Sequence, residues 1–327
     1  MSPFTTRQHL SNAFSRLRFG QLRLIVELQR TNSIRGAAET LNITQSALSK
    51  TLKEMESLFG TRLYDRSAHG VTPTAAGLVA ARCANLLLAE LDCFAREIRG
   101  AEIGEEESLR IGILSYLGAT FLPGVLTRLS GDRRAGRLQL EEDWSGPLLE
   151  KLAEGSLDMI LILCTEEMAV ALEEPAFAAE RLFDEELAVV AAPEHALAGR
   201  ERIALSELAE EKWLLSYQPS LTRITVDAAF LRAGCRPPRP FIESTALSNQ
   251  LEGAAAGLGI AATPSQGSEQ MIRSGRLVRL DVHPRVPLSP LMLLYRRSIQ
   301  EHPRLVALRD AVRKEFEAKQ RLCSERL

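Results

Sequence analysis

Capping residues in the segment 33–60 mark two short, adjacent helices, and this pattern limits the possible folds more than any other part of the sequence. Ser33 and Thr44 each stand directly before a run with helical apolar spacing, and a hydroxyl there accepts a hydrogen bond from a backbone N–H of the first turn. They predict helices over Ile34–Leu41 and from Gln45 to about Phe59, the latter closed by Gly60. Only a tight turn separates the two, so they must cross closely.

The second of these helices has two chemically different faces. Its apolar residues recur at steps of four, three and four, which predicts a face turned to the core: Leu48, Leu52, Met55 and Phe59. The opposite face is uncharged or cationic and carries Gln45, Ser46, Ser49, Lys50 and Lys53. An apolar stripe over Phe19–Gln29 predicts an earlier helix. Three such helices form a helix-turn-helix, although an ordinary surface helix also presents a polar face.

The next segment predicts a β-wing and then a long helix. Thr61–Pro73 alternates apolar and polar residues, and Gly70 can supply a hairpin turn. Thr74 caps a helix expected to end near Arg99. Along it, apolar residues recur every three or four positions, as in a coiled-coil seam: Ala80, Ala84, Leu87, Leu91, Phe94 and Ile98. This seam pairs two chains, or alternatively packs the helix on its own domain.

Residues 17–77 resemble the DNA-binding part of the LysR family of bacterial transcriptional regulators. The resemblance rests on matches at fixed spacing, namely Ser33, Ala37-Ala38, Leu41, Gln45, Ala47-Leu48-Ser49-Lys50, Glu56, Gly60, Leu63, Arg66 and Thr74 to Gly77. Two residues depart from the family pattern: Ser46 stands where proline is usual, and Tyr64 where phenylalanine is usual. Neither change removes a cationic or hydrogen-bonding group.

The resemblance implies that double-stranded DNA is the partner of this segment. A helix fits the major groove, where side chains near its N-terminus reach base edges. Gln45 suits an adenine edge, and Ser49 and Lys50 suit base edges or phosphates. Cationic side chains further out are expected on the phosphate backbone. The candidate DNA-binding residues are Ser33, Arg35, Gln45, Ser46, Ser49, Lys50, Lys53, Arg66 and His69.

From residue 109 the apolar pattern changes to short strands that alternate with helices, which indicates parallel sheets in βαβ units. The expected strands are Leu109–Leu114, Leu138–Glu142, Met159–Cys164, Glu186–Ala191, Trp213–Ser216, Ile260–Thr263 and Leu291–Tyr295. The expected helices are Thr120–Leu129, Pro147–Glu154, Ser206–Glu210, Thr222–Ala233 and Asn249–Ala256. Short matches at residues 109–113, 121–123, 154–158 and 257–261 resemble the effector-binding domain of the LysR family, which shares its fold with periplasmic solute-binding proteins.

The expected fold class is thus an N-terminal, all-α winged helix-turn-helix with a long linker helix, followed by a C-terminal α/β two-lobed, periplasmic-binding-protein-like domain. The predicted organisation is as follows: residues 1–77 bind DNA, residues 78–107 form the dimerisation helix and hinge, residues 108–300 bind the effector, and residues 301–327 form a C-terminal helix. Lobe I is expected over about 108–164 and 266–300, and lobe II over about 165–265. The family resemblance implies a homodimer or homotetramer.

In open α/β sheets, ligands bind beyond the carboxyl ends of the strands, where helix N-termini point N–H groups inward. Hydroxyl-bearing residues follow several of the expected strands. The candidate effector-binding residues are Ser115, Tyr116, Thr120, Ser145, Ser216, Ser220, Thr222 and Thr245. They suit a carboxylate or a sugar-type metabolite, although each alone is equally suited to capping a helix.

The net charge of −2 conceals an asymmetry along the chain. Residues 1–77 contain ten Lys and Arg against five Asp and Glu, whereas the remaining residues contain 30 against 37. A basic end on an acidic body suits a protein with one phosphate-binding part. An architectural DNA-binding protein without an effector would share the basic end, but the long α/β half argues against that alternative.

Other functional classes find little support in the sequence. Five dispersed cysteines (Cys83, Cys93, Cys164, Cys235 and Cys323) predict free thiols without a metal or cofactor, and a redox role for the distant Cys164 and Cys235 is not favoured. Gly257-x-Gly259 follows a helix and precedes a strand, so it predicts a tight turn and not a dinucleotide site. We find no hydrolase, zinc-protease or P-loop motif, no signal peptide and no membrane span. A cytoplasmic regulator that is not an enzyme is expected.

Overall fold

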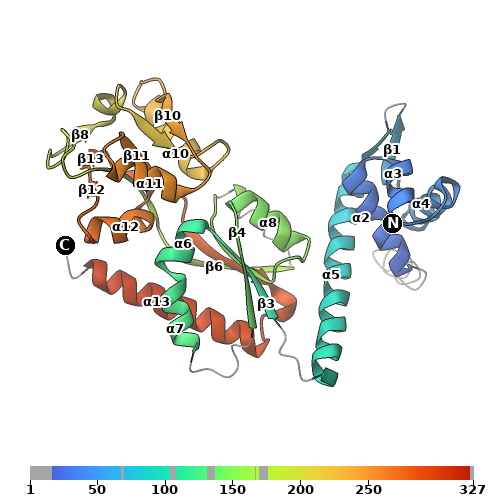
Figure 1. Cartoon of the computed structure of the whole chain (residues 1–327). Coiled ribbons are helices and arrows are strands. Elements are labelled where there is room, and N and C mark those ends of the chain that lie inside the picture. Colours follow the sequence, from blue (N-terminus) through green and yellow to red (C-terminus); the bar gives the residue numbers. More distant parts are fainter. Residues whose placement is uncertain are drawn as a thin grey trace, which may run out of the picture. The chain divides into compact units, whose positions relative to one another are not determined.

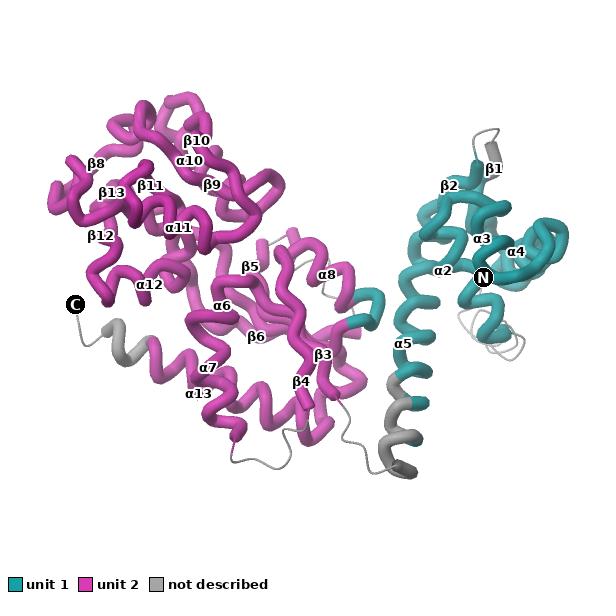
Figure 2. Tube along the Cα trace, viewed as in Figure 1, with its two compact units in different colours: residues 1–107, 153–156 teal, residues 108–152, 157–327 magenta. Residues whose placement is uncertain are grey.

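A computed structural model describes residues 17–67, 70–103, 108–130, 137–165, 167–168 and 176–324. The chain divides into two compact units, one of residues 1–107 with 153–156 and one of residues 108–152 with 157–327 (Figure 2). Among the described residues, no helix is both long enough and apolar enough to cross a bilayer.

Three helices open the first unit, and the caps that the sequence predicts at Ser33, Thr44 and Gly60 are present. They are α2 (Phe19–Thr31), α3 (Ile34–Thr40) and α4 (Gln45–Phe59). Ser33 Oγ accepts a hydrogen bond from the Gly36 N–H at 3.2 Å, and Thr44 Oγ1 accepts one from the Ala47 N–H at 3.1 Å. Gly60 ends α4 at φ +66°, in the left-handed region that glycine adopts without strain. The predicted helix-turn-helix is confirmed.

The wing consists of β1 (Tyr64–Ser67) and β2 (Gly70–Pro73), paired antiparallel, and it leads into α5 (Ala75–Ile103). Gly70, the predicted turn residue, begins the second strand, and residues 68–69 lie outside the described part. Thr74 Oγ1 accepts a hydrogen bond from the Gly77 N–H at 3.1 Å and caps α5 as expected. At Gly77 a side chain is excluded, because a Cβ would lie 2.0 Å from the Leu63 carbonyl oxygen. The wing strand and the long helix therefore lie close together.

The second unit contains two α/β lobes (Figure 1). Lobe I is built on a five-stranded sheet in the order β4-β3-β5-β15-β6. Its strands are β3 (Ser108–Ile113), β4 (Arg137–Glu142), β5 (Met159–Leu163), β6 (Phe177–Phe183) and β15 (Leu291–Arg296). Its helices are α6 (Ser115–Thr120), α7 (Leu122–Leu129), α8 (Ser145–Ala153) and the long α13 (Pro303–Ser324).

Lobe II is built on a sheet in the order β10-β9-β11-β7-β12, with β14 also paired to β7. Its strands are β7 (Glu186–Ala191), β9 (Trp213–Leu215), β10 (Pro240–Glu243), β11 (Ile260–Pro264), β12 (Val278–Arg279) and β14 (Val286–Pro287). A separate pair is formed by β8 (Ile203–Ala204) and β13 (Val282–His283), and η1 (Leu205–Leu208) is a short 3-10 helix. The helices are α10 (Leu221–Arg232), α11 (Leu247–Ala255) and α12 (Ser265–Arg273).

All seven predicted strands of this unit are present, but the predicted borders between the lobes are wrong. β6 pairs with β15 in lobe I, whereas β12 and β14 pair with β7 in lobe II. The chain therefore crosses between lobes at residues 184–185 and again at 288–290, not near 165 and 265. β6 was not predicted because it is an edge strand whose sequence shows little alternation of apolar and polar residues. The sheets are also mixed, not purely parallel, because β15 and β7 run antiparallel to neighbours in their sheets.

The helix predicted over Thr120–Leu129 is present as α7, two residues shorter at its start, and an additional helix that was not predicted, α6, precedes it. α6 ends at Thr120, and α7 begins at Leu122 with Pro123 in its first turn. Proline fits the first turn of a new helix, but inside a continuous helix it lacks the N–H for the carbonyl four residues earlier and its ring clashes with that carbonyl, which separates the two segments. The glycine-rich turn before β11 is confirmed, since Gly257 has φ +76° and a Cβ on Gly259 would lie 2.0 Å from the Lys212 carbonyl oxygen.

Candidate nucleic-acid interface and ligand cleft

Helix α4 is held with one face in the core of the first unit. Leu48, Leu52 and Met55 are completely buried against side chains of α2, α3 and the wing. Burying each such side chain contributes about 2 kcal/mol to folding. Glu56 extends the anchorage, because its Oε1 accepts hydrogen bonds from the backbone N–H groups of Leu63 at 2.9 Å and Tyr64 at 3.3 Å. The buried face of α4 and the hydrogen bonds of Glu56 therefore fix the orientation of this helix in the first unit.

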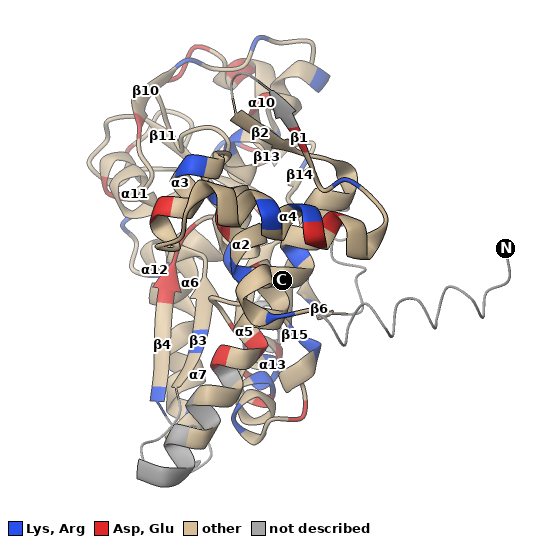
Figure 3. Ribbon diagram, turned by 90° about the vertical axis from the view of Figure 1, so that its right-hand side faces the viewer, with Lys and Arg blue, Asp and Glu red and all other residues tan. Residues whose placement is uncertain are grey.

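The opposite face of α4 is open to solvent. Gln45, Ser46, Lys50 and Lys53 are exposed, and Ser49 is half-buried. The Lys50 side chain is 80% exposed, and its Nζ lies 4.0 Å from Glu54 Oε1, a loose pair that costs little to break. Figure 3 marks the Lys and Arg residues of α3 and α4 in blue. This face presents amide, hydroxyl and ammonium groups along one helical edge.

The remaining predicted DNA-binding residues lie beside α4 or outside the described region. Ser33 caps α3, and exposed Arg35 on α3 donates from Nε to Glu39 Oε1 at 2.8 Å. Hydrogen bonding and the charge of Glu39 raise the pKa of the Arg35 guanidinium, so it is a permanent cation. Arg66 lies in β1, but its side chain is outside the described part, as is the whole of His69.

The predicted seam on α5 has two different environments along its length. At its start, Ala84 is buried in the core of the first unit, and Ala80 packs against that core. Further along, Leu87, Phe94 and Ile98 are 49%, 59% and 46% exposed. Leu91, on the same face, is half-buried. The beginning of the seam thus packs on its own domain, and the rest leaves an exposed apolar stripe over residues 87–98.

Seven of the eight predicted effector-binding residues border a single cleft between the lobes, with a cavity of about 90 Å3. They are Ser115, Tyr116, Ser145, Ser216, Ser220, Thr222 and Thr245. The cleft lies where β3, β4, β5, β9 and β11 end and where α6, α8, α10 and α11 begin. Backbone N–H groups at the starts of α8 and α10 are therefore directed towards it.

Thr120 is the predicted effector-binding residue that does not line the cleft. It ends α6 instead of starting a helix, and its Oγ1 donates to the Tyr116 carbonyl oxygen at 2.7 Å. The hydroxyl is thus engaged by its own helix. The error follows directly from the unforeseen break between α6 and α7.

A buried arginine holds the lobe II side of the cleft in place. Arg223, on the first turn of α10, donates to Asp227 on its own helix and, at 2.8 Å, to Glu243 Oε1 on β10. Ser220 Oγ caps α10 at the Arg223 N–H, at 3.2 Å, and donates to Ser216 Oγ at 2.7 Å. Ser216 and Ser220 therefore present a linked pair of hydroxyls, and only part of their hydrogen-bonding capacity is used within the cap.

Sequence reasoning missed several residues of the cleft, among them Asp143, Trp144 and Gln250. Gln250 is 2% exposed, and its Nε2 donates to the Ser244 carbonyl oxygen at 3.0 Å, which leaves Oε1 as its free end. Gln250 Oε1 and Tyr116 Oη are buried and lack a hydrogen-bond partner among the described residues. Asp143 and Trp144 follow directly after β4, which was the available signal, whereas Gln250 lies inside a helix and carried none.

Glu185 lies where the two crossings between the lobes meet. Its backbone carbonyl accepts a hydrogen bond from the Leu288 N–H at 2.9 Å, which joins the two crossing segments. Its 1% exposed side chain accepts hydrogen bonds from the Glu186 N–H at 3.1 Å and from the Ser265 N–H, at the start of α12, at 3.0 Å. Burial raises the pKa of this carboxyl against the opposing effect of these hydrogen bonds.

Comparison with known proteins accounts for both halves of the chain. Residues 103–317 match the family model of the LysR substrate binding domain, and residues 19–78 match that of the bacterial regulatory helix-turn-helix protein, lysR family. The chain belongs to the LysR family. LysR-type proteins are transcriptional regulators with a helix-turn-helix DNA-binding domain and an effector-binding domain, so the predicted function and fold class are confirmed.

Individual relatives can be aligned over most of this LysR-family chain. The uncharacterized HTH-type transcriptional regulator YybE of Bacillus subtilis (strain 168) is 30% identical over 244 residues, 75% of this chain and 81% of that protein. The hydrogen peroxide-inducible genes activator of Dickeya chrysanthemi is 28% identical over 299 residues, 90% of this chain and 95% of that protein. The structure of ArgP from Mycobacterium tuberculosis has a similar fold, with a TM-score of 0.61 at 22% identity, covering 90% of this chain and 96% of that one.

Proposed function

We propose that the polar face of α4 enters the major groove of double-stranded DNA. Gln45, Ser46, Ser49 and Lys50 lie on the first turns of the helix, where side chains reach base edges. Lys53 and Arg35 contact phosphates from the flanks, and Ser33, Arg66 and His69 complete the phosphate contacts from the start of α3 and the wing. The observation that carries this proposal is the exposed cationic and hydroxyl edge on a helix whose other face is fully buried.

The active regulator is a homo-oligomer paired through the apolar stripe of α5. The exposed Leu87, Phe94 and Ile98 fall on one helix face with the spacing of a coiled-coil seam. A paired rod presents two recognition helices to two DNA half-sites. Residues 1–77 thus form the DNA-binding domain, residues 78–107 the pairing helix and hinge, and residues 108–300 the sensor, whether the final assembly is a dimer or a tetramer.

The cleft between the lobes binds the effector, a small carboxylate or sugar-type metabolite. Its hydroxyl-rich rim and the starts of α8 and α10 supply hydrogen-bond donors, and Gln250 Oε1 supplies an acceptor. Buried polar atoms without a partner are rare in folded proteins, so a ligand hydroxyl that reaches Gln250 accounts for an otherwise costly arrangement. Cys164 is not proposed as the peroxide-sensing thiol that the name of the Dickeya chrysanthemi relative would suggest, because burial raises its pKa and suppresses its reactive thiolate.

The effector acts by closing the lobes about the crossings at residues 184–185 and 288–290. Closure changes how sensor domains pack in the oligomer, and this in turn changes the spacing of the DNA modules and the bend imposed on DNA. The protein thus acts on DNA in the cytoplasm and has no catalytic step of its own.

A ligand screen followed by footprinting tests this mechanism. Small carboxylates and sugars are first ranked by the rise they cause in the unfolding midpoint of the full chain. The best compound is then added during DNase I footprinting of the protein on its target DNA. An altered or shortened footprint supports the mechanism, whereas identical footprints with and without a bound compound refute it.

A further inference from the structure

Lobe II contains a second cavity that shares no lining residue with the cleft. It encloses about 260 Å3 on one face of the lobe II sheet. Leu187 and Val189 of β7, Trp213 of β9 and Phe230 of α10 form its apolar floor, and all are less than 9% exposed. The alternate residues of these strands, including Ala188 and Leu214, pack in the core with α11 on the other side of the sheet. The cavity therefore lies on the face that α11 leaves uncovered.

The cavity extends towards a neighbouring depression. This depression encloses about 430 Å3 between η1, the C-terminal half of α10 and the segment His283–Pro287. The two spaces share Leu205, Ala229, Arg285 and Val286 as lining residues. Figure 1 shows β8 and β13 side by side in this part of lobe II, and their pairing holds the segment that closes the cavity. Together the two spaces offer room for a single-ring molecule.

Two arginines lie on the rim of the cavity, each beside an acidic partner. Arg279 and Arg285 both line it, and both turn to the same carboxylate: Arg279 Nη2 lies 3.0 Å from Glu186 Oε2, and Arg285 Nη1 lies 3.5 Å from Glu186 Oε1. Asp281, also on the rim, is held by the Arg202 N–H at 2.9 Å and by His283 at 2.9 Å. One carboxylate is thus shared between two guanidinium groups, and Arg232 adds a further cation to the neighbouring depression.

We propose that this cavity is a second small-molecule site, which takes an apolar carboxylic acid with an aromatic ring or a branched chain. The apolar part lies against Leu187, Leu205 and Val286, the apolar lining residues that keep some accessible surface, and its burial removes hydrocarbon from water. The carboxylate accepts charge-assisted hydrogen bonds from Arg279 and Arg285, whose side chains are 41% and 63% exposed and can turn towards it. An apolar floor with a few charged groups at the rim is the usual composition of a small-ligand site.

Fluorine NMR of the full chain with 4-(trifluoromethyl)benzoate tests the proposal, with 4-(trifluoromethyl)benzyl alcohol as the neutral analogue. Fragments of this size bind with Kd values of about 1 to 5 mM. Two cavity variants are compared with the native chain. R279Q/R285Q removes the rim charge at exposed positions, and Ala229→Leu fills the floor at a 5% exposed position. If Ala229→Leu does not fold, the arginine variant carries the test alone.

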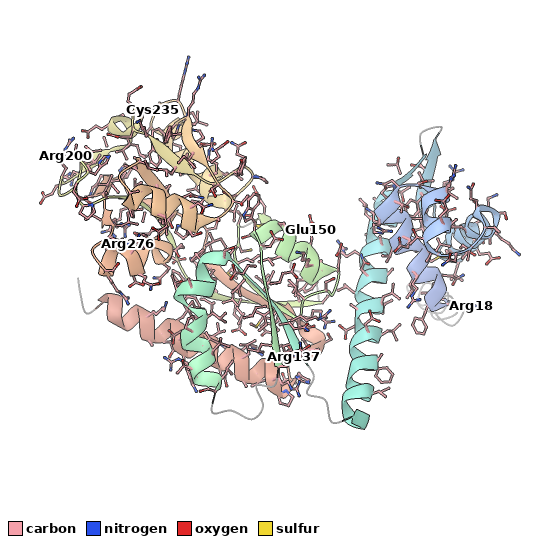
Figure 4. All side chains as sticks on the ribbon, viewed as in Figure 1. Arg18, Arg137, Glu150, Arg200, Cys235 and Arg276 are labelled. Carbon is pink, nitrogen blue, oxygen red and sulfur yellow. The ribbon has the colours of Figure 1, made fainter. Side chains whose placement is uncertain are left out.

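Two control variants locate the bound probe. Arg276→Gln removes a cation from lobe II outside the cavity, where Arg276 pairs with Glu252 and is labelled in Figure 4. Thr245→Val alters the cleft. We expect saturable binding of the benzoate, about tenfold weaker for the alcohol and for both cavity variants, and within about twofold of native for both controls. No saturation below roughly 10 mM, native affinity in R279Q/R285Q, or loss of binding in Thr245→Val would each overturn the proposal.

Discussion

Arg296 Nη2 lies 2.6 Å from Asp158 Oδ1, and both side chains are buried, with 1% and 4% of their surfaces exposed. The pair joins β15, which comes from the C-terminal part of the chain, to the residue that precedes β5. Arg110 on β3 adds a second guanidinium, with Nη2 at 2.9 Å from the same oxygen. Three strands of lobe I, from three distant parts of the sequence, are therefore joined through one carboxylate.

Replacing this carboxylate should strongly destabilise lobe I. Asp158→Asn leaves the buried Arg296 without its carboxylate, and breaking a buried pair costs about 3 kcal/mol. The measurement is urea unfolding followed by tryptophan fluorescence, which reports on this unit because both tryptophans, Trp144 and Trp213, belong to it. Asp310→Asn is the matched control, since Asp310 is 52% exposed and lies 3.8 Å from Arg313. If Asp158→Asn unfolds at the same urea concentration as Asp310→Asn, the Asp158 carboxylate does not stabilise lobe I.

Asp158 also predicts a sensitivity to acid. Burial alone would raise its pKa, but the hydrogen bonds and charge of Arg110 and the charge of Arg296 outweigh burial and lower it. The folded state therefore favours the ionised form, and this stabilisation is present above the unfolded pKa of about 3.9. It is lost as the pH falls below that value. The difference in unfolding midpoint between native and Asp158→Asn chains should shrink between about pH 4 and pH 3.

Glu185 should show the opposite dependence on pH. Its pKa is raised by burial, so the folded state holds the proton more tightly than the unfolded state does. The resulting stabilisation is present below the unfolded pKa of about 4.3 and is lost as the pH rises through the folded-state value. In Glu185→Gln, which keeps an oxygen for the N–H groups of Ser265 and Glu186, unfolding midpoints should vary less with pH above about 4.3. An unchanged pH profile would contradict the raised pKa.

The sequence was most informative where the physical determinants were local. Ser33, Thr44 and Gly60 determine where α3 and α4 begin and end, and neighbouring residues decide whether a cap forms. Most hydroxyls of the cleft could also be predicted, because they follow strands whose carboxyl ends share one edge of a sheet. The positions of the crossings between the lobes depend on which strands pair with β15 and which pair with β7. These pairings join distant parts of the chain, so no local sequence pattern predicts them. Gln250 was not predicted for the same reason. Its place in the cleft depends on its hydrogen bond to the Ser244 carbonyl and on the packing of the two lobes around the cleft.

The α5 stripe predicts a change in oligomeric state. Leu87→Glu with Phe94→Glu places two charges on the exposed part of the seam and should convert the paired chain into a monomer at micromolar concentration. Light scattering coupled to size-exclusion chromatography measures the mass. Leu78→Glu is the control, because Leu78 is 51% exposed but lies half a turn away around the same helix. An oligomer that survives the double change would show that the stripe is not the interface.

Cys164 should resist oxidation. Its thiol is buried after β5, donates to the Thr165 carbonyl oxygen at 3.4 Å, and has a pKa raised by burial. Cys235 follows α10 in lobe II, where Figure 4 labels it, and both are free thiols. After brief exposure to equimolar hydrogen peroxide, peptide mass spectrometry should find Cys164 unmodified. Its recovery in a disulfide with Cys235 would contradict this account.

The salt dependence of DNA binding shows whether the polar face of α4 lies against DNA. The full chain, Lys50→Ala/Lys53→Ala, and a Lys314→Ala/Lys319→Ala control with lysines on α13 are titrated against a fluorescent 30-base-pair duplex at several KCl concentrations. If α4 lies against DNA, the α4 variant should bind about tenfold or more weakly, with a salt slope lower by about 1 to 2. The control should match the native chain. Native affinity and slope in the α4 variant would contradict the account.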